Sequence, residues 1–142
     1  MGEARLAAAN GEVPVGALVV RENEIVGRGA NAMEREQDPT AHAEMAAIKQ
    51  AAAYLGTRRL HDTTLYVSLE PCSMCAGAIV LARIPLLVFG AHDPKGGACG
   101  SLRNVVRDLR LNHQCEVRGG VMEPECGGLL KEFFSDIRSS TA

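Results

Sequence analysis

The sequence lacks a long uninterrupted hydrophobic run. Its most apolar region, residues 76–91, contains Arg83 and Pro85, which excludes a membrane-spanning helix there. The chain also lacks an excess of basic residues: 15 Lys and Arg stand against 17 Asp and Glu, for a formal net charge of −2. Any binding of nucleic acid must therefore come from a local basic patch and not from a basic chain.

Internal repeats, low-complexity tracts and a secretory signal are also missing. The 142 residues predict one domain over residues 1–142, and an apolar content of 46% is ordinary for a globular protein with a buried core. The five cysteines are an odd number, which favours metal or redox chemistry in a reducing compartment over a disulfide framework. We therefore expect a cytoplasmic protein that does not associate with membranes.

Strand and helix patterns alternate along the chain after an opening hairpin. Residues 15–20 and 25–29 are rich in β-branched side chains and predict the two strands of that hairpin. The residues from 30 to 38 and from 92 to 101 are interpreted as loops. Further strands are predicted at 65–69, 86–90 and 115–117, and helices at 3–9, 40–55, 71–84, 102–109 and 123–137. This order favours an α/β fold, a three-layer α/β/α domain with a mixed five-stranded sheet.

Four side chains with metal or acid–base chemistry lie at the starts of two predicted helices. His42 and Glu44 begin the first of these helices, and Cys72 and Cys75 begin the second. One imidazole and two thiolates are typical zinc ligands, and three protein ligands leave the fourth position of a catalytic zinc open to water. Glu44 is then placed as a proton carrier rather than as a fourth ligand. The positive end of a helix dipole also favours thiolates.

These residues match a known spacing. His42-Ala43-Glu44 followed by Pro71-Cys72-Ser73-Met74-Cys75 is the H-x-E…P-C-x-x-C signature of zinc deaminases. A closed structural zinc site is the alternative, and it needs a fourth protein ligand. The candidates for that ligand are Cys99, Cys115, Cys126 and His92. We interpret the three remaining cysteines as buried apolar residues.

Nearly the whole chain resembles the bacterial tRNA-specific adenosine deaminases, which belong to the zinc-dependent cytidine deaminase superfamily. The likeness runs through residues 11–17 (GEVPVGA), 38–44 (DPTAHAE), 64–72 (TLYVSLEPC) and the loop from Asp93 to Ser101. The metal motif is common to the superfamily, whereas this loop is more specific to the enzymes that act on tRNA. The first helix is shorter than is usual in that family.

The resemblance implies a cytidine-deaminase-like fold, one Zn²⁺ per chain, a homodimer, and hydrolytic conversion of adenosine to inosine at the wobble position of the tRNA anticodon loop. It implies that Asn31 hydrogen-bonds the flipped adenine and that Pro14 and Leu69 form the wall of the base pocket. It also implies that Asp93 and Lys95 contact the sugar-phosphate backbone, and that Phe134 touches the substrate.

Two other functions are compatible with the same residues. A deaminase of a free base or nucleoside, of the guanine or cytosine type, would use the same zinc chemistry. A non-catalytic RNA-binding or assembly module would instead hold a structural zinc with four protein ligands and no water.

Overall fold

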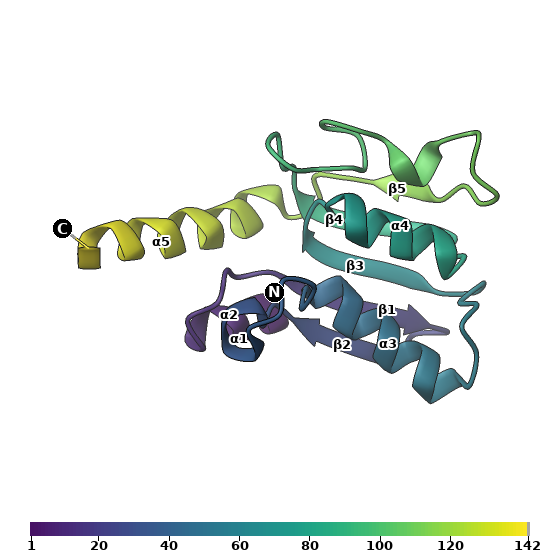
Figure 1. The fold of residues 1–142 in the computed structure, drawn as a ribbon, viewed down its shortest axis with the longest axis horizontal. Coiled ribbons are helices and arrows are strands. Elements are labelled where there is room, and N and C mark those ends of the chain that lie inside the picture. Colours follow the sequence, from purple (N-terminus) through teal and green to yellow (C-terminus); the bar gives the residue numbers. More distant parts are fainter. Residues whose placement is uncertain (142) are drawn as a thin grey trace.

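A five-stranded sheet forms the centre of the structure, a computed structural model that describes residues 1–141 and the side chains of residues 1–139 (Figure 1). The strands lie in the order β2-β1-β3-β4-β5, with β1 antiparallel to both of its neighbours and β3, β4 and β5 parallel to one another. The predicted mixed sheet is therefore confirmed. The strands are β1 (Gly16–Arg21), β2 (Glu24–Ala30), β3 (Thr64–Leu69), β4 (Leu86–Ala91) and β5 (Glu116–Arg118).

The opening hairpin is closed by a two-residue turn. Glu22 and Asn23 both have positive φ angles, 50° and 63°, as the type I′ turn between twisted strands requires. The turn pairs Arg21 with Glu24, and an irregularity between Val19 and Val20 shifts the register by one residue, so that Gly16 pairs with Ala30.

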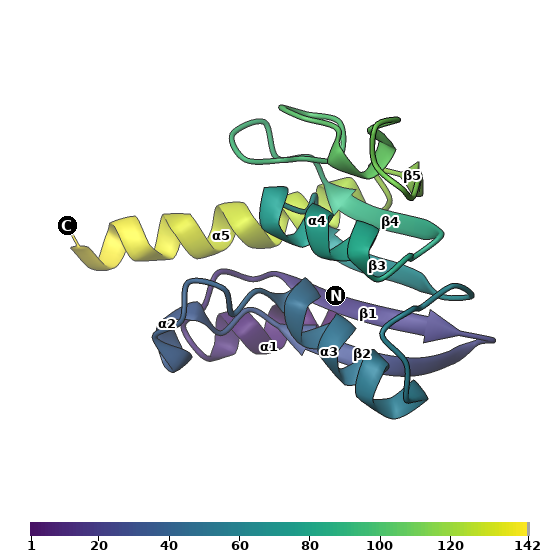
Figure 2. The same ribbon diagram turned by 45° about the vertical axis from the view of Figure 1, so that its right-hand side comes forward.

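Helices cover both faces of the sheet (Figures 1 and 2). On one face, α3 (Ala43–Leu55) and α4 (Ser73–Leu81) lie side by side, and on the other face lie α1 (Gly2–Ala9) and the start of α5 (Glu123–Thr141). The C-terminal part of α5 extends beyond the sheet in both views. None of the described helices is long and apolar enough to cross a bilayer.

Helix α3 packs closely on the sheet because the residue beneath its first turn is a glycine. A Cβ atom at Gly29 on β2 would collide with the backbone carbonyl of Ala43, in the first turn of α3. On the opposite face, a Cβ atom at Gly16 would collide with the backbone of Ala4 in α1. The two glycines therefore set how near each helix lies to the sheet. The core between these layers contains fully buried side chains that include Val19, Leu60, Leu65, Ile79, Ile84 and Leu87.

The carboxyl ends of β3 and β4 lie next to each other. Leu69, the last residue of β3, pairs with Ala91, the last residue of β4. Ligands of open α/β sheets bind at the carboxyl ends of parallel strands. The segment 70–75 follows β3 directly and the loop 92–101 follows β4, so two of the predicted site segments meet at this edge.

Several predicted elements differ from the structure, and one of them is α4, which spans Ser73–Leu81 instead of 71–84. Helix α3 begins at Ala43 and not at Thr40, because the Thr40 hydroxyl and N–H both donate to the Asp38 carboxylate in a turn that precedes the helix. The predicted loop 30–38 contains a one-turn helix, α2 (Met33–Glu36). The predicted helix 102–109 is only a 3₁₀ turn, η1 (Val105–Arg107).

Candidate active site

His42 and Glu44 are positioned by the start of α3. His42 is the N-cap residue, in extended backbone with φ −83° and ψ 151°, and Glu44 lies in the first helical turn. The Glu44 side chain is buried, with an exposed fraction of 4%. A buried carboxylate beside an imidazole at a helix N-terminus is stabilised by the helix dipole.

Cys72 and Cys75 occupy the matching place on α4. Cys72 is its N-cap residue, also in extended backbone, and Cys75 lies in its first turn. The Cys72 carbonyl accepts a hydrogen bond of 2.8 Å from the Ala76 N–H, which holds that turn closed. The two thiols therefore face the same point from one helix, and His42 approaches it from another.

The distances among these three side chains fit a tetrahedral zinc. Nδ1 of His42 lies 3.6 Å from Sγ of Cys72 and 3.4 Å from Sγ of Cys75, and all three ligand atoms lie within 4.8 Å of one another. Tetrahedral bonds of about 2.3 Å to sulfur and about 2.0 Å to nitrogen put those two ligand atoms about 3.5 Å apart. The donor set and its spacing therefore agree with the metal that the sequence predicts.

The pKa values of the two thiols are shifted in opposite directions. A hydrogen bond from Cys75 lowers the pKa of Cys72 to about 5, although partial burial acts in the opposite direction. The same hydrogen bond, together with burial and the nearby Glu44 carboxylate, raises the pKa of Cys75 well above its usual value. Binding of a divalent cation is what allows both sulfurs to be thiolates at once.

Glu44 titrates near neutrality. Burial raises the pKa of Glu44 to about 7, against the lowering effects of its own backbone N–H and of His42. A carboxyl group with such a pKa can accept and release a proton at neutral pH, which is the property needed of a general acid–base group.

A cavity of about 160 Å³ opens onto this cluster. A cavity of about 150 Å³ is large enough for benzene, so this one takes a single flat ring system and not a base pair. The structure brings six of the predicted residues together on its wall. They are Asn31, His42, Glu44, Leu69, Cys72 and Asp93.

Asn31 has an unused acceptor in this cavity. Its side chain is 7% exposed, and its Nδ2 lies 3.4 Å from the Val13 carbonyl. The Oδ1 atom is buried and has no hydrogen-bond partner among the described residues. A buried polar group without a partner is costly, so Oδ1 is suited to a ligand that brings a hydrogen-bond donor.

Three of the predicted substrate-contact residues do not line the cavity, and neither does the predicted metal ligand Cys75. Pro14 is buried between Val13 and Val15, which do line it. Lys95 lies two residues beyond Asp93 in the 92–101 loop, and its N–H donates to the Asp93 carboxylate over 3.0 Å. Phe134 lies on α5, with an exposed fraction of 43%.

Sequence reasoning missed several wall residues. Val13, Val15, Met33 and Ala43 complete the apolar part of the wall, and Glu70 adds a second buried carboxylate. Of these residues, only Glu70 could have been recognised from the sequence. A carboxylate directly after a strand that is predicted to be buried requires hydrogen-bond or ion-pair partners.

The other cysteines do not complete a four-ligand site in the part of the chain that the structure describes. The one cluster of potential metal ligands found there is His42, Cys72 and Cys75. Cys99 and Cys115 are buried and free, and burial raises the pKa of Cys115 to about 11. This favours the open catalytic site over the closed structural one.

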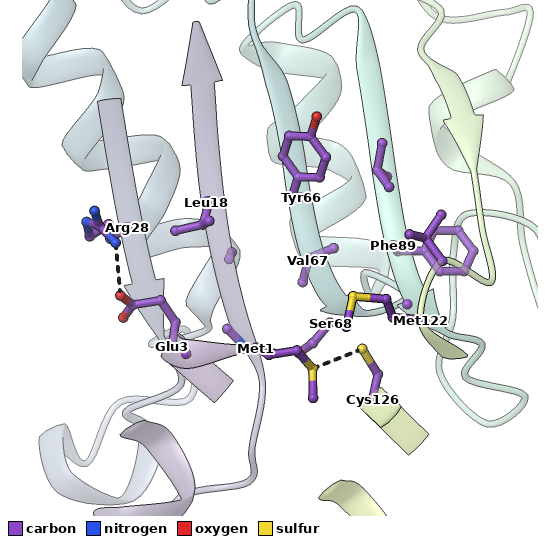
Figure 3. Close-up of a pocket in the computed structure, with 16 residues that line it drawn as sticks. Met1, Glu3, Leu18, Arg28, Tyr66, Val67, Ser68, Phe89, Met122 and Cys126 are labelled. Atoms are coloured by element: carbon purple, nitrogen blue, oxygen red, sulfur yellow. Dashed lines mark hydrogen bonds and ion pairs between the residues drawn. The ribbon is translucent and has the colours of Figure 1, made fainter. Parts of the chain in front are cut away.

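A larger cavity of about 290 Å³ lies on the other face of the sheet, between α1 and α5 (Figure 3). Its wall includes Met1, Tyr66, Phe89 and Met122, and contains none of the predicted site residues. It has no cluster of metal ligands among the described residues. We therefore assign the chemistry to the smaller cavity.

The chain is similar to known deaminases. A family model described as MafB19-like deaminase matches residues 1–138. The tRNA-specific adenosine deaminase of Bacillus subtilis (strain 168) is 54% identical over 136 residues, which cover 96% of this chain and 84% of the relative.

Solved structures give the same result. A chain from a study of A-to-I editing by tRNA:A34 deaminases at the wobble position superimposes with a TM-score of 0.87 at 43% identity, covering 91% of this chain and 94% of that chain. A guanine deaminase from Nitrosomonas europaea superimposes with a TM-score of 0.79 at 25% identity, covering 92% of this chain and 78% of that chain. The similar proteins thus include a deaminase that edits tRNA and one named for guanine.

Proposed function

Because the chain belongs both to the MafB19-like deaminases and to the family of the tRNA-specific adenosine deaminases, we propose that it deaminates adenosine to inosine at the wobble position of tRNA. The overall reaction consumes water, forms a C6–O bond, breaks the bond from C6 to the exocyclic nitrogen and releases ammonia. The tRNA anticodon loop is its substrate, and the place where it acts is the cytoplasm.

The observation that carries this proposal is the combination found in one small cavity. A nitrogen and two sulfur ligand atoms lie beside a buried carboxylate that titrates near pH 7. The cavity has room for one ring system, so an adenine must leave its stack to enter. Unstacked loop bases are the form in which RNA is usually read.

The metal proposed for His42, Cys72 and Cys75 is one zinc ion per chain. When bound, zinc supplies a nucleophilic water that ionises at a pKa of about 7. The three side chains hold the ion, and the N-termini of α3 and α4 favour the negative charge on their ligands.

The catalytic role falls to Glu44. Its carboxylate accepts one proton from water and delivers it to the ring nitrogen of adenine. It then accepts the second proton, from the hydroxyl group now on C6, and delivers it to the leaving amine, so that the carbonyl of inosine and ammonia are formed. The Asn31 Oδ1 accepts a hydrogen bond from the base, which supplies the partner that this atom lacks. Leu69 lies on the cavity wall and supports the base, and Pro14 supports it from between the wall residues Val13 and Val15. The Cys72 N–H, at the start of α4, is the proposed donor to the developing negative oxygen.

The RNA backbone is proposed to lie along the 92–101 loop. Asp93 is on the cavity wall, and Lys95 is the neighbouring cation. Phe134 is half-exposed on α5 and is the proposed apolar contact to the loop. A local set of contacts of this kind is needed because the chain as a whole carries a net charge of −2.

A free-base deaminase is the second candidate. The similarity to the guanine deaminase of Nitrosomonas europaea favours it, because the same ligands and carboxylate would serve either purine. The higher identity to deaminases of tRNA favours the RNA substrate.

Ammonia release separates the two candidates. The zinc-loaded protein is incubated in parallel with an anticodon stem–loop carrying adenosine at the wobble position, with guanine and with cytidine. We expect ammonia from the stem–loop and none from the small molecules. Activity on guanine or cytidine with none on the RNA would contradict the proposal.

We propose a homodimer as the active assembly. Large apolar side chains are exposed on α4 and on the segment packed near it, with exposed fractions of 75% at Leu81, 55% at Leu102 and 88% at Leu109. A contiguous patch of exposed apolar side chains is typical of an interface, and we propose that these leucines contribute to one. Light scattering should give twice the mass of one chain, and a monomer at assay concentrations would contradict this.

A further inference from the structure

Glu70 is a buried carboxylate that belongs to neither the metal ligands nor the proton pathway. It follows β3 directly and its side chain is 2% exposed. Among the described residues it has no ion pair with a Lys, Arg or His side chain. A buried charge without an opposite charge must be stabilised by hydrogen bonds.

All of those hydrogen bonds come from one loop. The Glu70 carboxylate accepts N–H donors from Asp93 at 3.0 Å, Cys99 at 3.1 Å and Ser101 at 3.0 Å. The Ser101 hydroxyl donates a further hydrogen bond to the same carboxylate. Burial alone would raise the pKa of Glu70, but these donors outweigh it and lower the pKa below its usual value.

The loop is shaped around this carboxylate. A Cβ atom at Gly97 would overlap the carboxylate of Glu70, so the backbone can approach only because residue 97 is glycine. The Ala98 N–H donates to the Pro71 carbonyl over 2.8 Å, and the Gly97 N–H donates to the Asp93 carbonyl over 2.9 Å. The segment 93–101 is therefore wrapped around the Glu70–Pro71 peptide.

Glu70 thus connects the two parts of the site. It lies two residues before the ligand Cys72, it lines the small cavity, and it receives the backbone N–H of Asp93, which lines the same cavity. The position of Asp93 relative to the metal ligands is fixed through this hydrogen bond and the loop closure that accompanies it.

We propose that Glu70 is a positioning residue for substrate binding: its carboxylate organises the 93–101 loop, so that Asp93 and its neighbours are ready to receive the RNA. The inference rests on the proposed function, because it names tRNA as the substrate whose binding the loop serves. Glu70 is not one of the proposed metal ligands, and its role is exerted through the loop.

The chain offers a matched control directly before Val13, which lines the cavity. Glu12 is also a buried carboxylate, 2% exposed, and it accepts the N–H groups of Glu34 at 3.0 Å and Arg35 at 2.7 Å. It therefore holds α2 and has no hydrogen bond to the 93–101 loop. Glu12→Gln makes the same chemical change as Glu70→Gln on a different segment.

A double-mutant cycle tests the proposal. Zinc-loaded wild type, Glu70→Gln, Asp93→Ala and the double variant are compared for KM and kcat on the anticodon stem–loop, and for its Kd by fluorescence anisotropy. An amide at position 70 turns N–H groups toward N–H donors, so we expect KM and Kd to rise about tenfold with kcat within about threefold. In the Asp93→Ala background the same change should alter KM less than about twofold, because the residue that Glu70 positions is gone.

The control cycle uses Glu12→Gln with Asp93→Ala, and its effects should multiply as for independent sites. Zinc content should remain at about one ion per chain in all variants. If Glu70→Gln fails to fold, Ser101→Ala removes one donor only and should raise KM about threefold with the same dependence on Asp93.

The proposal is overturned if the effect of Glu70→Gln is absent, if it is undiminished in the Asp93→Ala background, or if it consists of zinc loss. A wild-type protein that makes no inosine contradicts the proposed function instead. The anisotropy measurement still tests the loop in that case, because it reports binding and not turnover.

Discussion

The two cavities on opposite faces of the sheet differ in how their walls are held. The cavity at the metal ligands is the smaller, at about 160 Å³, and its wall includes two buried carboxylates and an unpartnered amide oxygen. The cavity between α1 and α5 is about 290 Å³ and is lined mainly by apolar side chains and glycine backbone (Figure 3). The smaller cavity is organised for chemistry, and the larger one is a gap between layers.

The larger of the two cavities is therefore not the one that holds the candidate catalytic groups. The small cavity is distinguished by two carboxylates on its wall, Glu44 and Glu70, whose pKa values are shifted in opposite directions. Glu44 is buried with few donors, so its pKa rises to about 7, whereas Glu70 is held by four donors and its pKa falls. Glu44 can therefore exchange a proton near neutral pH, whereas Glu70 stays ionised and acts as a hydrogen-bond acceptor for the loop.

Removal of a metal ligand should have the largest effect. His42→Ala leaves two thiols without the nitrogen that lies 3.4 Å from Cys75, so we expect both bound zinc and inosine formation to fall to background. Elemental analysis and nucleoside mass spectrometry on one sample measure both. A variant that keeps its zinc and its activity would assign the metal to other residues.

Loss of the proton carrier should be nearly as severe but should spare the metal. Glu44→Ala is expected to lower turnover by about 10²- to 10⁴-fold while zinc stays at about one ion per chain. Glu125→Ala, an exposed carboxylate on α5, is the control and should behave as wild type. Zinc loss in Glu44→Ala would show that Glu44 is needed to hold the ion.

Added methyl groups on the two sheet faces should separate structure from chemistry. Gly29→Ala and Gly16→Ala both overpack a helix, and each should cost about 1–3 kcal/mol of unfolding free energy in urea titrations. Only Gly29→Ala displaces Ala43, which lies between His42 and Glu44, so only this variant should also weaken zinc retention against a chelator. Equal zinc loss in both variants would mean that the two faces are coupled.

A pH effect is expected beside the larger cavity. The Glu123 carboxylate accepts a hydrogen bond of 2.9 Å from His92 Nδ1, and this lowers the pKa of Glu123 below 4.5. A lowered pKa stabilises the folded state above the unfolded pKa, and that contribution disappears as the pH falls through the folded value. Glu123→Gln should therefore unfold at a lower temperature than wild type at pH 6, and the difference should shrink as the pH falls below 4.5 through the folded value. A difference that does not shrink in acid would show that packing, and not the charge of Glu123, causes it.

Substitution on the wall of the larger cavity should have the smallest effect. Tyr66 is 43% exposed there, and Tyr66→Ala should leave kcat/KM for the stem–loop within about twofold of wild type. A tenfold loss with unchanged thermal stability would show that the larger cavity takes part in substrate binding, and the contrast between the two cavities would fail.

The sequence was sufficient to predict the fold class and the residues that form the metal cluster. His42, Glu44, Cys72 and Cys75 are recognisable because each pair lies at the start of one helix, where the spacing along the chain fixes the geometry. The mixed sheet could be predicted because each strand is recognisable from a short run of neighbouring residues.

The rest depended on contacts between distant segments. The hydrogen bonds of Glu70 come from residues 23 to 31 positions later, and no local pattern records them. The start of α3 was placed too early because the Asp38–Thr40 turn competes with the helix for the same polar groups. Helix α2 is short and is held by the distant Glu12, so its sequence reads as a loop.

The most direct test of the whole account is inosine formation in an anticodon stem–loop by protein whose zinc content is known. The account predicts inosine at the wobble adenosine, its loss when a chelator removes the zinc, and its return when zinc is added back. Inosine formation that survives complete removal of the metal, or an unmodified RNA with fully zinc-loaded protein, would contradict it.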